Sequence, residues 1–421
     1  MPDMPKGTER PEVNQTTGAI DQTSEQHPFT AAERISKALR KRKQRNQIRR
    51  MAGKYLGTAI MVTALILAVV VVYRNWDFFK PESFKETVTI RSDSKSLMKI
   101  GGAMDVITGN TAQYMSFASG LAVVTTTNIR YATEAGDAGF LADLTLNQPA
   151  AAASGSHLVV YDRGGKTVAS ADESGILAKA EALGNCISAD VNRNGWIAIV
   201  SECEGYQCAA AVYDQQMNRR YVWKTPAYFA AGAIASENGN YMAVLTVSIE
   251  ERQLSAKVLV FHLQKEGVAA EIDLGAARVL DVMENDVGLL IVTDTEAITA
   301  SWSGAVTGRV SFQGDQVCGM EKDGHAIFLL LTAENDATVR YRLTRLDETG
   351  TQTARIHLKC DVQAISAGNG MLALLTGSQI RLYDETLAVK KYVSPEPGIT
   401  NIVMMRNNKL VMITAQELFI A

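Results

Sequence analysis

The sequence is poor in the residues on which most enzymes and metalloproteins depend. Its histidines are scattered, and His27, His157, His262, His325 and His357 form no metal-ligand or zinc-protease spacing. The sequence has no nucleophile-elbow or EF-hand motif. Aromatic residues make up only 7% of the chain, which weighs against a carbohydrate-binding row of rings. We therefore expect no catalytic activity, no cofactor and no bound metal.

The near-neutral charge of −3 hides an asymmetry along the chain. Residues 1–73 contain 12 Lys and Arg against 6 Asp and Glu, whereas the remainder contains 30 against 39. Nucleic-acid binding is driven mainly by basic side chains that displace counterions from phosphates. The acidic body of the chain therefore argues against a nucleic-acid ligand.

Long apolar runs are absent except for one, which extends from Tyr55 to Tyr73 without a charged residue. As a helix its 19 residues would span ~28 Å, close to the thickness of the hydrocarbon core of a bilayer. Residues 34–54 carry ten basic residues, and residues 74–94 carry four. The positive-inside rule predicts a cytoplasmic N-terminus and an extracytoplasmic body, hence a single-pass protein of the cell membrane.

Two alternatives to this anchor are less consistent with the sequence. A cleaved signal peptide would not carry 54 preceding residues, and a buried helix would not be flanked by such a charge cluster. The predicted organisation is a basic and partly disordered tail (1–54), a transmembrane helix (55–73), a linker (74–86) and a folded domain (87–421). The basic residues predicted to contact anionic lipid are Arg40, Lys41, Arg42, Lys43, Arg45, Arg49 and Arg50.

The folded domain contains short apolar runs at regular spacing, most of them preceded by a turn signal such as Asn194-Gly195. A strand with apolar/polar alternation usually follows each run, which indicates that one of its faces is wet. The runs begin at Leu121, Leu158, Trp196, Tyr241, Val287, Ala326, Met371 and Lys409.

This repeat of roughly 40 residues with four strands predicts an all-β fold, a β-propeller. Eight runs favour eight blades, and seven blades with one irregular unit is the alternative. The last unit ends one strand early, so we expect Val88–Arg91 to supply the missing strand and close the ring.

Cysteine chemistry and one glycine-rich segment leave open questions. The cysteine count of five is odd, so at least one has no intramolecular partner. Cys203 and Cys208 bracket a short turn, and a disulfide between them is one of two open possibilities. Gly164-Gly165-Lys166-Thr167 has the end of a phosphate-binding loop but not its first glycine, so a hairpin turn is expected there.

Three segments carry a family resemblance: Arg342–Gly350, Arg381–Thr386 and Val160–Gly165. They resemble the strand and turn of quinoprotein-like propeller repeats, although only Trp223 lies near the place of the Trp that usually follows in the outer strand. With its basic tail and single span, the chain resembles a clostridial family of single-pass membrane proteins known only as a domain of unknown function. The resemblance implies a cell-membrane location and supplies no activity.

These observations favour a non-catalytic propeller that serves as a protein-interaction scaffold, or as an assembly or binding module, in the cell envelope. The alternatives are a ligand-sensing or carbohydrate-binding ectodomain and a degenerate quinoprotein-type redox enzyme. Membrane lipid and an envelope protein are the expected partners. An acidic residue of an inner strand, Asp190, Asp281 or Asp361, is a candidate to line the central channel.

Overall fold

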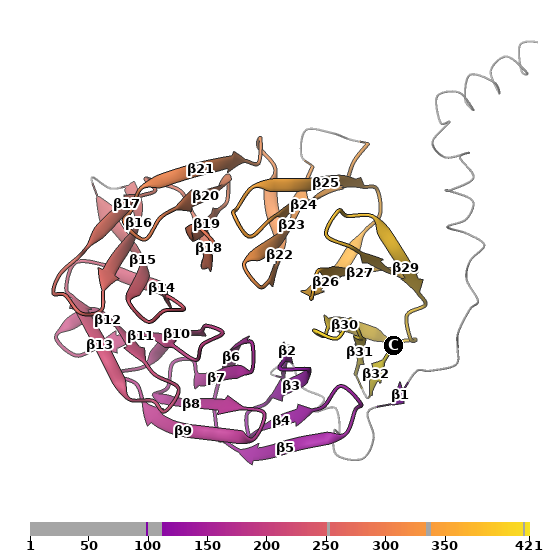
Figure 1. The fold of residues 1–421 in the computed structure, drawn as a ribbon, viewed down its shortest axis with the longest axis horizontal. Coiled ribbons are helices and arrows are strands. Elements are labelled where there is room, and N and C mark those ends of the chain that lie inside the picture. The colour runs from indigo at the N-terminus through magenta and orange to yellow at the C-terminus, as the bar shows by residue number, and fades with distance from the viewer. Residues whose placement is uncertain (1–97, 100–111, 251–252, 334–337, 416) are drawn as a thin grey trace, which may run out of the picture. The chain divides into compact units, whose positions relative to one another are not determined.

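The computed structural model describes residues 98–99, 112–250, 253–333, 338–415 and 417–421, and the regular elements in these ranges are β-strands. They form eight four-stranded antiparallel sheets. Figure 1 shows these sheets arranged as blades around a common centre. The structure therefore confirms the all-β propeller and its eight blades, and it excludes the seven-bladed alternative.

Seven blades are continuous in sequence and are numbered here in chain order. Blades 1 and 2 contain β2 (Gln113–Phe117), β3 (Gly120–Val124), β4 (Asn128–Ala132), β5 (Ala138–Asp143), β6 (Pro149–Ser154), β7 (His157–Asp162), β8 (Thr167–Asp172) and β9 (Gly175–Glu181). Blades 3 and 4 contain β10 (Cys186–Val191), β11 (Ile197–Cys203), β12 (Tyr206–Tyr213), β13 (Arg219–Thr225), β14 (Phe229–Ala235), β15 (Tyr241–Glu250), β16 (Gln253–His262) and β17 (Ala270–Asp273).

Blades 5 to 7 repeat the pattern, and blade 8 is assembled from both ends of the domain. Blades 5 and 6 contain β18 (Val279–Asn285), β19 (Gly288–Thr293), β20 (Glu296–Ala300), β21 (Val306–Ser311), β22 (Gln316–Asp323), β23 (Ala326–Thr332), β24 (Tyr341–Leu346) and β25 (Gln352–Leu358). Blades 7 and 8 contain β26 (Val362–Gly368), β27 (Met371–Thr376), β28 (Ile380–Tyr383), β29 (Val389–Val393), β30 (Ile399–Met404), β31 (Leu410–Thr414), β32 (Leu418–Ile420) and β1 (Met98–Lys99).

An early strand closes the ring by completing the last blade. The strand order of blade 8 is β1-β32-β31-β30, and Met98 pairs with Ile420 and Lys99 with Phe419. The prediction of closure by a strand that precedes blade 1 is confirmed in kind but wrong in position, because Met98–Lys99 fills the place expected for Val88–Arg91. Residues 88–91 lie outside the described part of the chain.

The apolar runs found in the sequence are the second strands of the blades, β3, β7, β11, β15, β19, β23, β27 and β31. Leu121–Val124, Leu158–Val160 and Leu289–Val292 are almost fully buried there. Side chains of the two faces of each sheet pack on the two neighbouring blades, and eight apolar clusters result, one at each interface between blades. A strand buried on both faces has no wet positions, which explains the continuous apolar runs.

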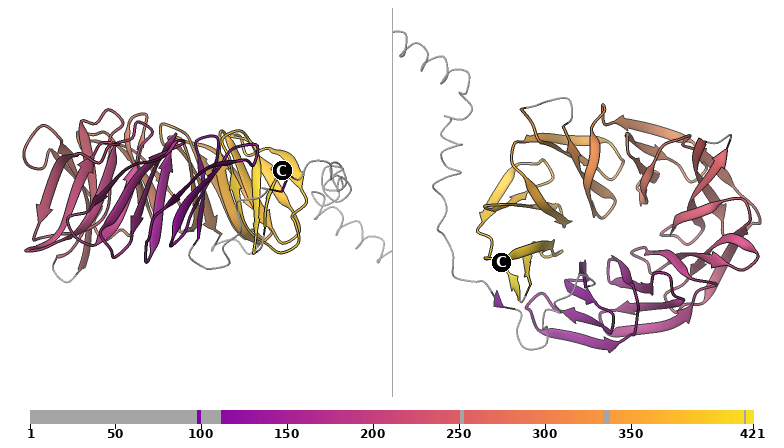
Figure 2. Two further views of the ribbon diagram at one scale, coloured as in Figure 1. Left: turned by 90° about the horizontal axis from the view of Figure 1, so that it is seen from below. Right: turned by 180° about the vertical axis from the view of Figure 1, so that it is seen from behind.

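Chain direction defines two faces of the ring, which Figure 2 shows from the side. The innermost strand of a blade runs toward one face, turns there into the second strand, and the second strand turns into the third at the opposite face. We call the face where the innermost strand turns into the second strand the mouth face. The opposite face, where the second strand turns into the third, is the hairpin face. Gly164–Lys166 form part of such a hairpin-face turn between β7 and β8, as expected for that segment.

The predicted tail, span and linker lie at residues 1–86, outside the part of the chain that the structure describes. None of the described segments contains a helix long and apolar enough to cross a membrane. The predicted span from Tyr55 to Tyr73 and the basic cluster from Arg40 to Arg50 therefore stay predictions.

Candidate functional site

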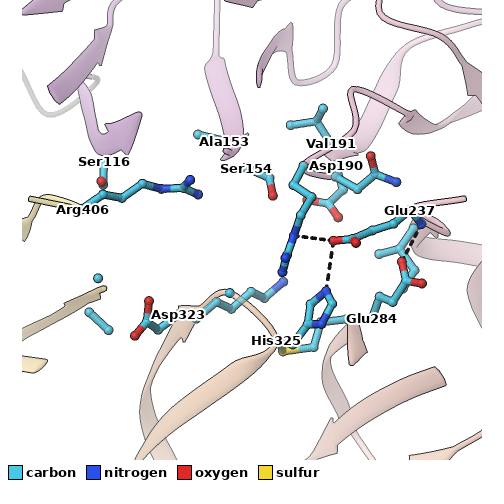
Figure 3. A pocket seen from close by; sticks show the side chains of 18 of the residues that line it. Ser116, Ala153, Ser154, Asp190, Val191, Glu237, Glu284, Asp323, His325 and Arg406 are labelled. Atoms are coloured by element: carbon cyan, nitrogen blue, oxygen red, sulfur yellow. Dashed lines mark hydrogen bonds and ion pairs between the residues drawn. The ribbon is translucent and has the colours of Figure 1, made fainter. Parts of the chain in front are cut away.

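A polar cavity of about 410 Å³ opens where the innermost strands reach the mouth face. Its lining comes from β10, β14, β18, β22 and β26 and from the turns that follow them, with further residues from blades 1, 2 and 8. Innermost strands have blade neighbours on both sides but face an open centre, so their ends can carry charged side chains. Figure 3 shows these side chains converging on the cavity.

Short mouth-face turns hold the charged residues in place. Asn192 Oδ1 accepts hydrogen bonds from the N–H groups of Asn194 and Trp196, both at 3.0 Å, and thereby shapes the turn that carries Arg193. In the next blade, Ser236 Oγ accepts from the N–H of Tyr241 at 2.9 Å and shapes the turn that carries Glu237. Side-chain caps of this kind fix the turns without help from a ligand.

Four consecutive blades contribute to one chain of ion pairs along the mouth. Arg193 Nε of blade 3 lies 2.6 Å from Glu237 Oε1 of blade 4. Glu237 Oε1 is also 3.0 Å from His325 Nε2 of blade 6, and His325 Nδ1 is 2.6 Å from Asp286 Oδ1 of blade 5. Both ring nitrogens of His325 thus lie within hydrogen-bond distance of carboxyl oxygens. We call these four residues the ion-pair belt.

Two further carboxyl groups tie the mouth-face turns together through the backbone. Glu284 Oε2 accepts from the N–H of Glu237 at 2.7 Å, and burial raises the pKa of Glu284. Asp323 accepts from the N–H groups of Asn369 and Gly370 at 2.9 and 2.6 Å, which joins blade 6 to blade 7. Both carboxyl groups line the cavity, yet their hydrogen bonds serve the contacts between blades.

Deeper in the channel, Lys322 lies between two carboxyl groups and lines a second cavity of about 220 Å³. Its Nζ is 2.7 Å from Asp281 Oδ2. Burial acts to lower the pKa of Lys322, but Asp281 and Asp190 outweigh burial and hold that pKa above its ordinary value. Burial also raises the pKa of Asp190, while Lys322 opposes that rise. The positive charge of Lys322 is therefore attracted to both carboxyl groups. Asp190 and Lys322 line both cavities.

One side of the cavity differs because its arginine makes no direct contact with a hydrogen-bonding or charged group among the described residues. Arg406, in the turn between β30 and β31, has no hydrogen bond or ion pair with any described residue. Burial and the nearby guanidinium of Arg193 lower the pKa of Arg406, and Asp323 opposes them. The hydroxyl oxygen of Ser116, on β2 of the adjacent blade, is buried and has no hydrogen-bond partner within the described ranges. Figure 3 shows Arg406 extending into the cavity from the side of Ser116.

A second surface stands out on the hairpin face, where β15 and β16 of blade 4 extend to ten residues each. Their last pairs include Ile249 opposite Leu254. The neighbouring strand β14 pairs with β15 only up to Phe229 opposite Val247, and β17 pairs with β16 only from Lys257 onward. The end of this hairpin is therefore two-stranded, and we call it the blade 4 tip.

Large apolar side chains are exposed at the blade 4 tip and on the adjoining strand β14, beside the exposed polar Gln253. Ile249 is 78% exposed, Leu254 46% and Phe229 61%. Strand alternation places them on the sheet face that carries Ala243 and Leu245, which pack toward blade 5. The tip thus continues an interface between blades past the point where the neighbouring strands pair with it.

The sequence identified part of the channel lining and missed the rest of the site. Asp190 and Asp281 line the channel as expected. Asp361 does not, because it lies before β26 and pairs with Arg340 at 2.6 Å. The ion-pair belt, Arg406 and Ser116 were not predicted, since they come from different turns that only ring closure brings together. The only local indication of these residues in the sequence was that a polar residue stands beside each turn motif.

The two cysteines singled out in the sequence are both buried and unbridged in the structure. They lie on the paired strands β11 and β12, and Cys208 Sγ is 3.3 Å from the carbonyl oxygen of Tyr228. Burial raises the pKa of Cys208. A bridge between Cys203 and Cys208 stays a prediction. Over the described ranges no group of three or more His, Cys, Asp or Glu side chains is placed to hold a metal ion.

Comparisons with known proteins agree with this architecture. A model of a family of unknown function, DUF5711, matches residues 94–420. The chain is similar to the C-terminal WD40 domain of Sif2, at 10% identity and a TM-score of 0.52, over 78% of this chain and 99% of that domain. It is also similar to the computationally designed Ika8 protein, at 10% identity and a TM-score of 0.51, over 74% of this chain and 96% of that one. The comparison with curated proteins gave no match. Likeness at this identity shows the fold alone.

Proposed function

This chain belongs to the family of unknown function DUF5711, and from its architecture we propose that it is a non-catalytic interaction module, a membrane-anchored propeller that binds a protein in the cell envelope. The observation that carries this proposal is the blade 4 tip. Ile249 and Leu254 at the two-stranded end of the hairpin, and Phe229 on the adjoining strand β14, expose large apolar side chains on one face of the sheet.

The energetic argument is that such a tip is costly unless it is covered. Two strands alone are marginally stable in water. Burying a side chain of the size of Ile, Leu or Phe contributes about 1.5–3 kcal/mol. A partner that covers Phe229, Ile249 and Leu254 would therefore gain several of these contributions at one place.

The tip also specifies the chemistry of its partner. Beyond Val247 on β15 and before Ala256 on β16, no third strand pairs with the outer edges of these strands among the described residues. An extended peptide segment can pair with such an edge and place alternate apolar side chains on the exposed face. We propose an extended, apolar segment of a protein partner as the occupant of the blade 4 tip.

The location is supported by the sequence. An uncharged run from Tyr55 to Tyr73 with a basic N-terminal flank is the pattern of a single span with its N-terminus in the cytoplasm. The ring would then lie outside the cytoplasm, where its partner belongs to the cell envelope. Protease added to intact cells should remove the ring and spare the tail; complete protection of residues 112–421 would contradict this location.

The channel mouth supports the non-catalytic reading. A histidine with acidic neighbours at one end of a propeller channel is what an enzyme would show, and His325 with Glu237 and Asp286 has that composition. Both ring nitrogens of His325, however, lie against carboxyl groups of blades 4 and 5. A general acid or base needs a nitrogen within reach of substrate, so the belt is better suited to joining blades than to proton transfer.

The partner surface can be tested in cells that produce the full chain. A photo-crosslinking residue at Ile249 should capture one discrete protein, and Ile249→Ser and Leu254→Ser should each reduce co-purification of that same protein about tenfold or more. The apolar contribution lost at each site is the reason for the size of the effect.

The matched control is Leu141, which is 64% exposed on the outer strand β5 of blade 1. A crosslinker at Leu141 and the variant Leu141→Ser should leave the captured protein and its recovery unchanged. Crosslinking of Ile249 to lipid alone, or equal recovery with all three serine variants, would overturn the assignment of this surface.

A further inference from the structure

Most charged side chains around the mouth cavity have a hydrogen-bond or ion-pair partner, and one cation has none among the described residues. Arg193 is engaged by Glu237, and Lys322 by Asp281. Glu284 and Asp323 accept hydrogen bonds from backbone N–H groups. Arg406 is the cation of this lining that makes no hydrogen bond or ion pair in the described part of the chain, and Asp323 attracts it only from a longer distance.

A second, independent feature lies on the same side of the cavity. Ser116 Oγ is removed from solvent and makes no hydrogen bond within the described ranges. Buried polar groups in native proteins are nearly always hydrogen-bonded, and each exception calls for an explanation such as a missing ligand. Arg406 comes from blade 8 and Ser116 from blade 1, so the unpaired guanidinium and the unpaired hydroxyl belong to adjacent blades and line one cavity.

We propose that this side of the channel mouth binds the oxyanion group, a carboxylate or a phosphate, of a small soluble ligand, with Arg406 as its principal donor and the covered hydroxyl of Ser116 as a second donor that ligand binding uncovers. Arg193 lies on the adjoining part of the lining and contributes positive potential. The binding site is defined by these three residues.

The chemistry of the donors sets the class of ligand. A guanidinium and a hydroxyl offer hydrogen-bond donors, and the planar guanidinium matches the two oxygens of a carboxylate or phosphate. A neutral sugar or an amine would leave the charge of Arg406 uncompensated. The cavity, at about 410 Å³, falls in the range of small-molecule sites. The acidic belt on the opposite side adds a polar wall that favours a ligand with further hydroxyl or amino groups.

This inference is independent of the protein-binding surface. The cavity lies at the mouth face and the blade 4 tip at the hairpin face, so either can fail without the other. A ligand at the mouth would give the propeller a sensing role in addition to a scaffold role.

The test is isothermal titration calorimetry of the full chain, purified in detergent, with citrate and with inorganic phosphate at constant ionic strength. We expect at least one probe to bind with a millimolar or tighter Kd. Arg406→Gln should weaken binding about tenfold or more, since it removes a charge-assisted hydrogen bond, and Ser116→Ala should weaken it about threefold. Arg406→Lys should restore part of the affinity through its charge.

The control variant is Arg278→Gln, an exposed arginine in the loop between β17 and β18, outside the cavity lining. It should bind the probes like the unmodified chain. Binding of citrate alone assigns a carboxylate ligand, and binding of phosphate alone assigns a phosphorylated one. Failure of both probes to bind, equal affinity with Arg406→Gln, or equal competition by chloride would overturn the proposal.

Discussion

The two faces of the ring are made from the same hairpins, yet their turns are packed differently. On the mouth face, a Cβ at Gly239 would lie 2.3 Å from ring atoms of Trp196 in the adjacent blade, and one at Gly155 would contact Arg193 at 3.5 Å. On the hairpin face, a Cβ at Gly164, Gly205 or Gly377 would meet nothing within 4 Å. At these positions neighbouring blades touch at the mouth face, whereas the three hairpin-face glycines have open space around them.

This difference separates two tasks. Interlocked turns at the mouth hold charged side chains from several blades at fixed distances, which a small-molecule site requires. A turn with space around it can change length without disturbing the ring, and in blade 4 the strands β15 and β16 extend to ten residues each. Function at the mouth therefore depends on the whole ring, whereas function at the tip depends on one hairpin.

The largest effect that distinguishes the faces is expected for a pair of glycine substitutions. Gly239→Ala should lower the free energy of unfolding by about 3 kcal/mol, because a positive φ of 66° and the contact with Trp196 both oppose a methyl group. Gly205→Ala, with a φ of 79° and no neighbour, should lower it by only about 1 kcal/mol. Chemical denaturation of the full chain, monitored by tryptophan fluorescence, measures both variants. Equal losses of unfolding free energy would show that the two faces do not differ in packing.

A pH-dependent effect is expected near the mouth at Glu321 on β22. Burial raises the pKa of Glu321 from 4.5 to about 7, although the N–H of Ala367 opposes the rise. The folded state then binds more protons than the unfolded state between these values, so the stabilising contribution is present at low pH and is lost as pH rises from about 4.5 to 7. Glu321→Gln should be more stable than the unmodified chain by about 2 kcal/mol at pH 8 and equal to it at pH 4. An equal difference at both pH values would contradict this assignment.

A smaller effect is expected from untying two blades at the mouth. Asp323→Ala leaves the N–H groups of Asn369 and Gly370 without their acceptor, which should cost about 1–2 kcal/mol. Asp323→Asn keeps one acceptor oxygen and should lose about half as much. Chemical denaturation at pH 7 measures both variants, and a loss no greater for alanine than for asparagine would show that these bonds do not join the blades.

The smallest effect on stability is expected at the blade 4 tip. Ile249→Ser and Leu254→Ser should each change the free energy of unfolding by less than about 0.5 kcal/mol, because the side chains of Ile249 and Leu254 are exposed and lie outside the buried core. The same thermal and chemical denaturation series applies. A loss above about 2 kcal/mol would mean that these residues support the ring, and the tip would no longer qualify as a free surface.

The fold could be predicted from the sequence because the same pattern, an apolar run beside a turn motif, recurs in every blade. Each buried second strand, such as Leu289–Val292, carries its apolar run in a continuous segment beside its turn. The closing strand was placed wrongly because Met98–Lys99 is only two residues long and has no periodicity to detect. Asp190 and Asp281 were recognised from their place on inner strands, but Asp361 lies just before its strand and pairs outward.

The repeat length, the eight units and the burial of their second strands were determined by the sequence alone, since strand pairing within a hairpin is local and its pattern is written in consecutive residues. Tertiary structure decided which polar side chains meet at the mouth. Arg406 and Ser116 are separated by almost the whole domain and become neighbours only when the last blade closes on the first. Ring closure brings together residues that are distant in the sequence. A contact that depends on ring closure therefore leaves no pattern in the residues around Arg406 or around Ser116.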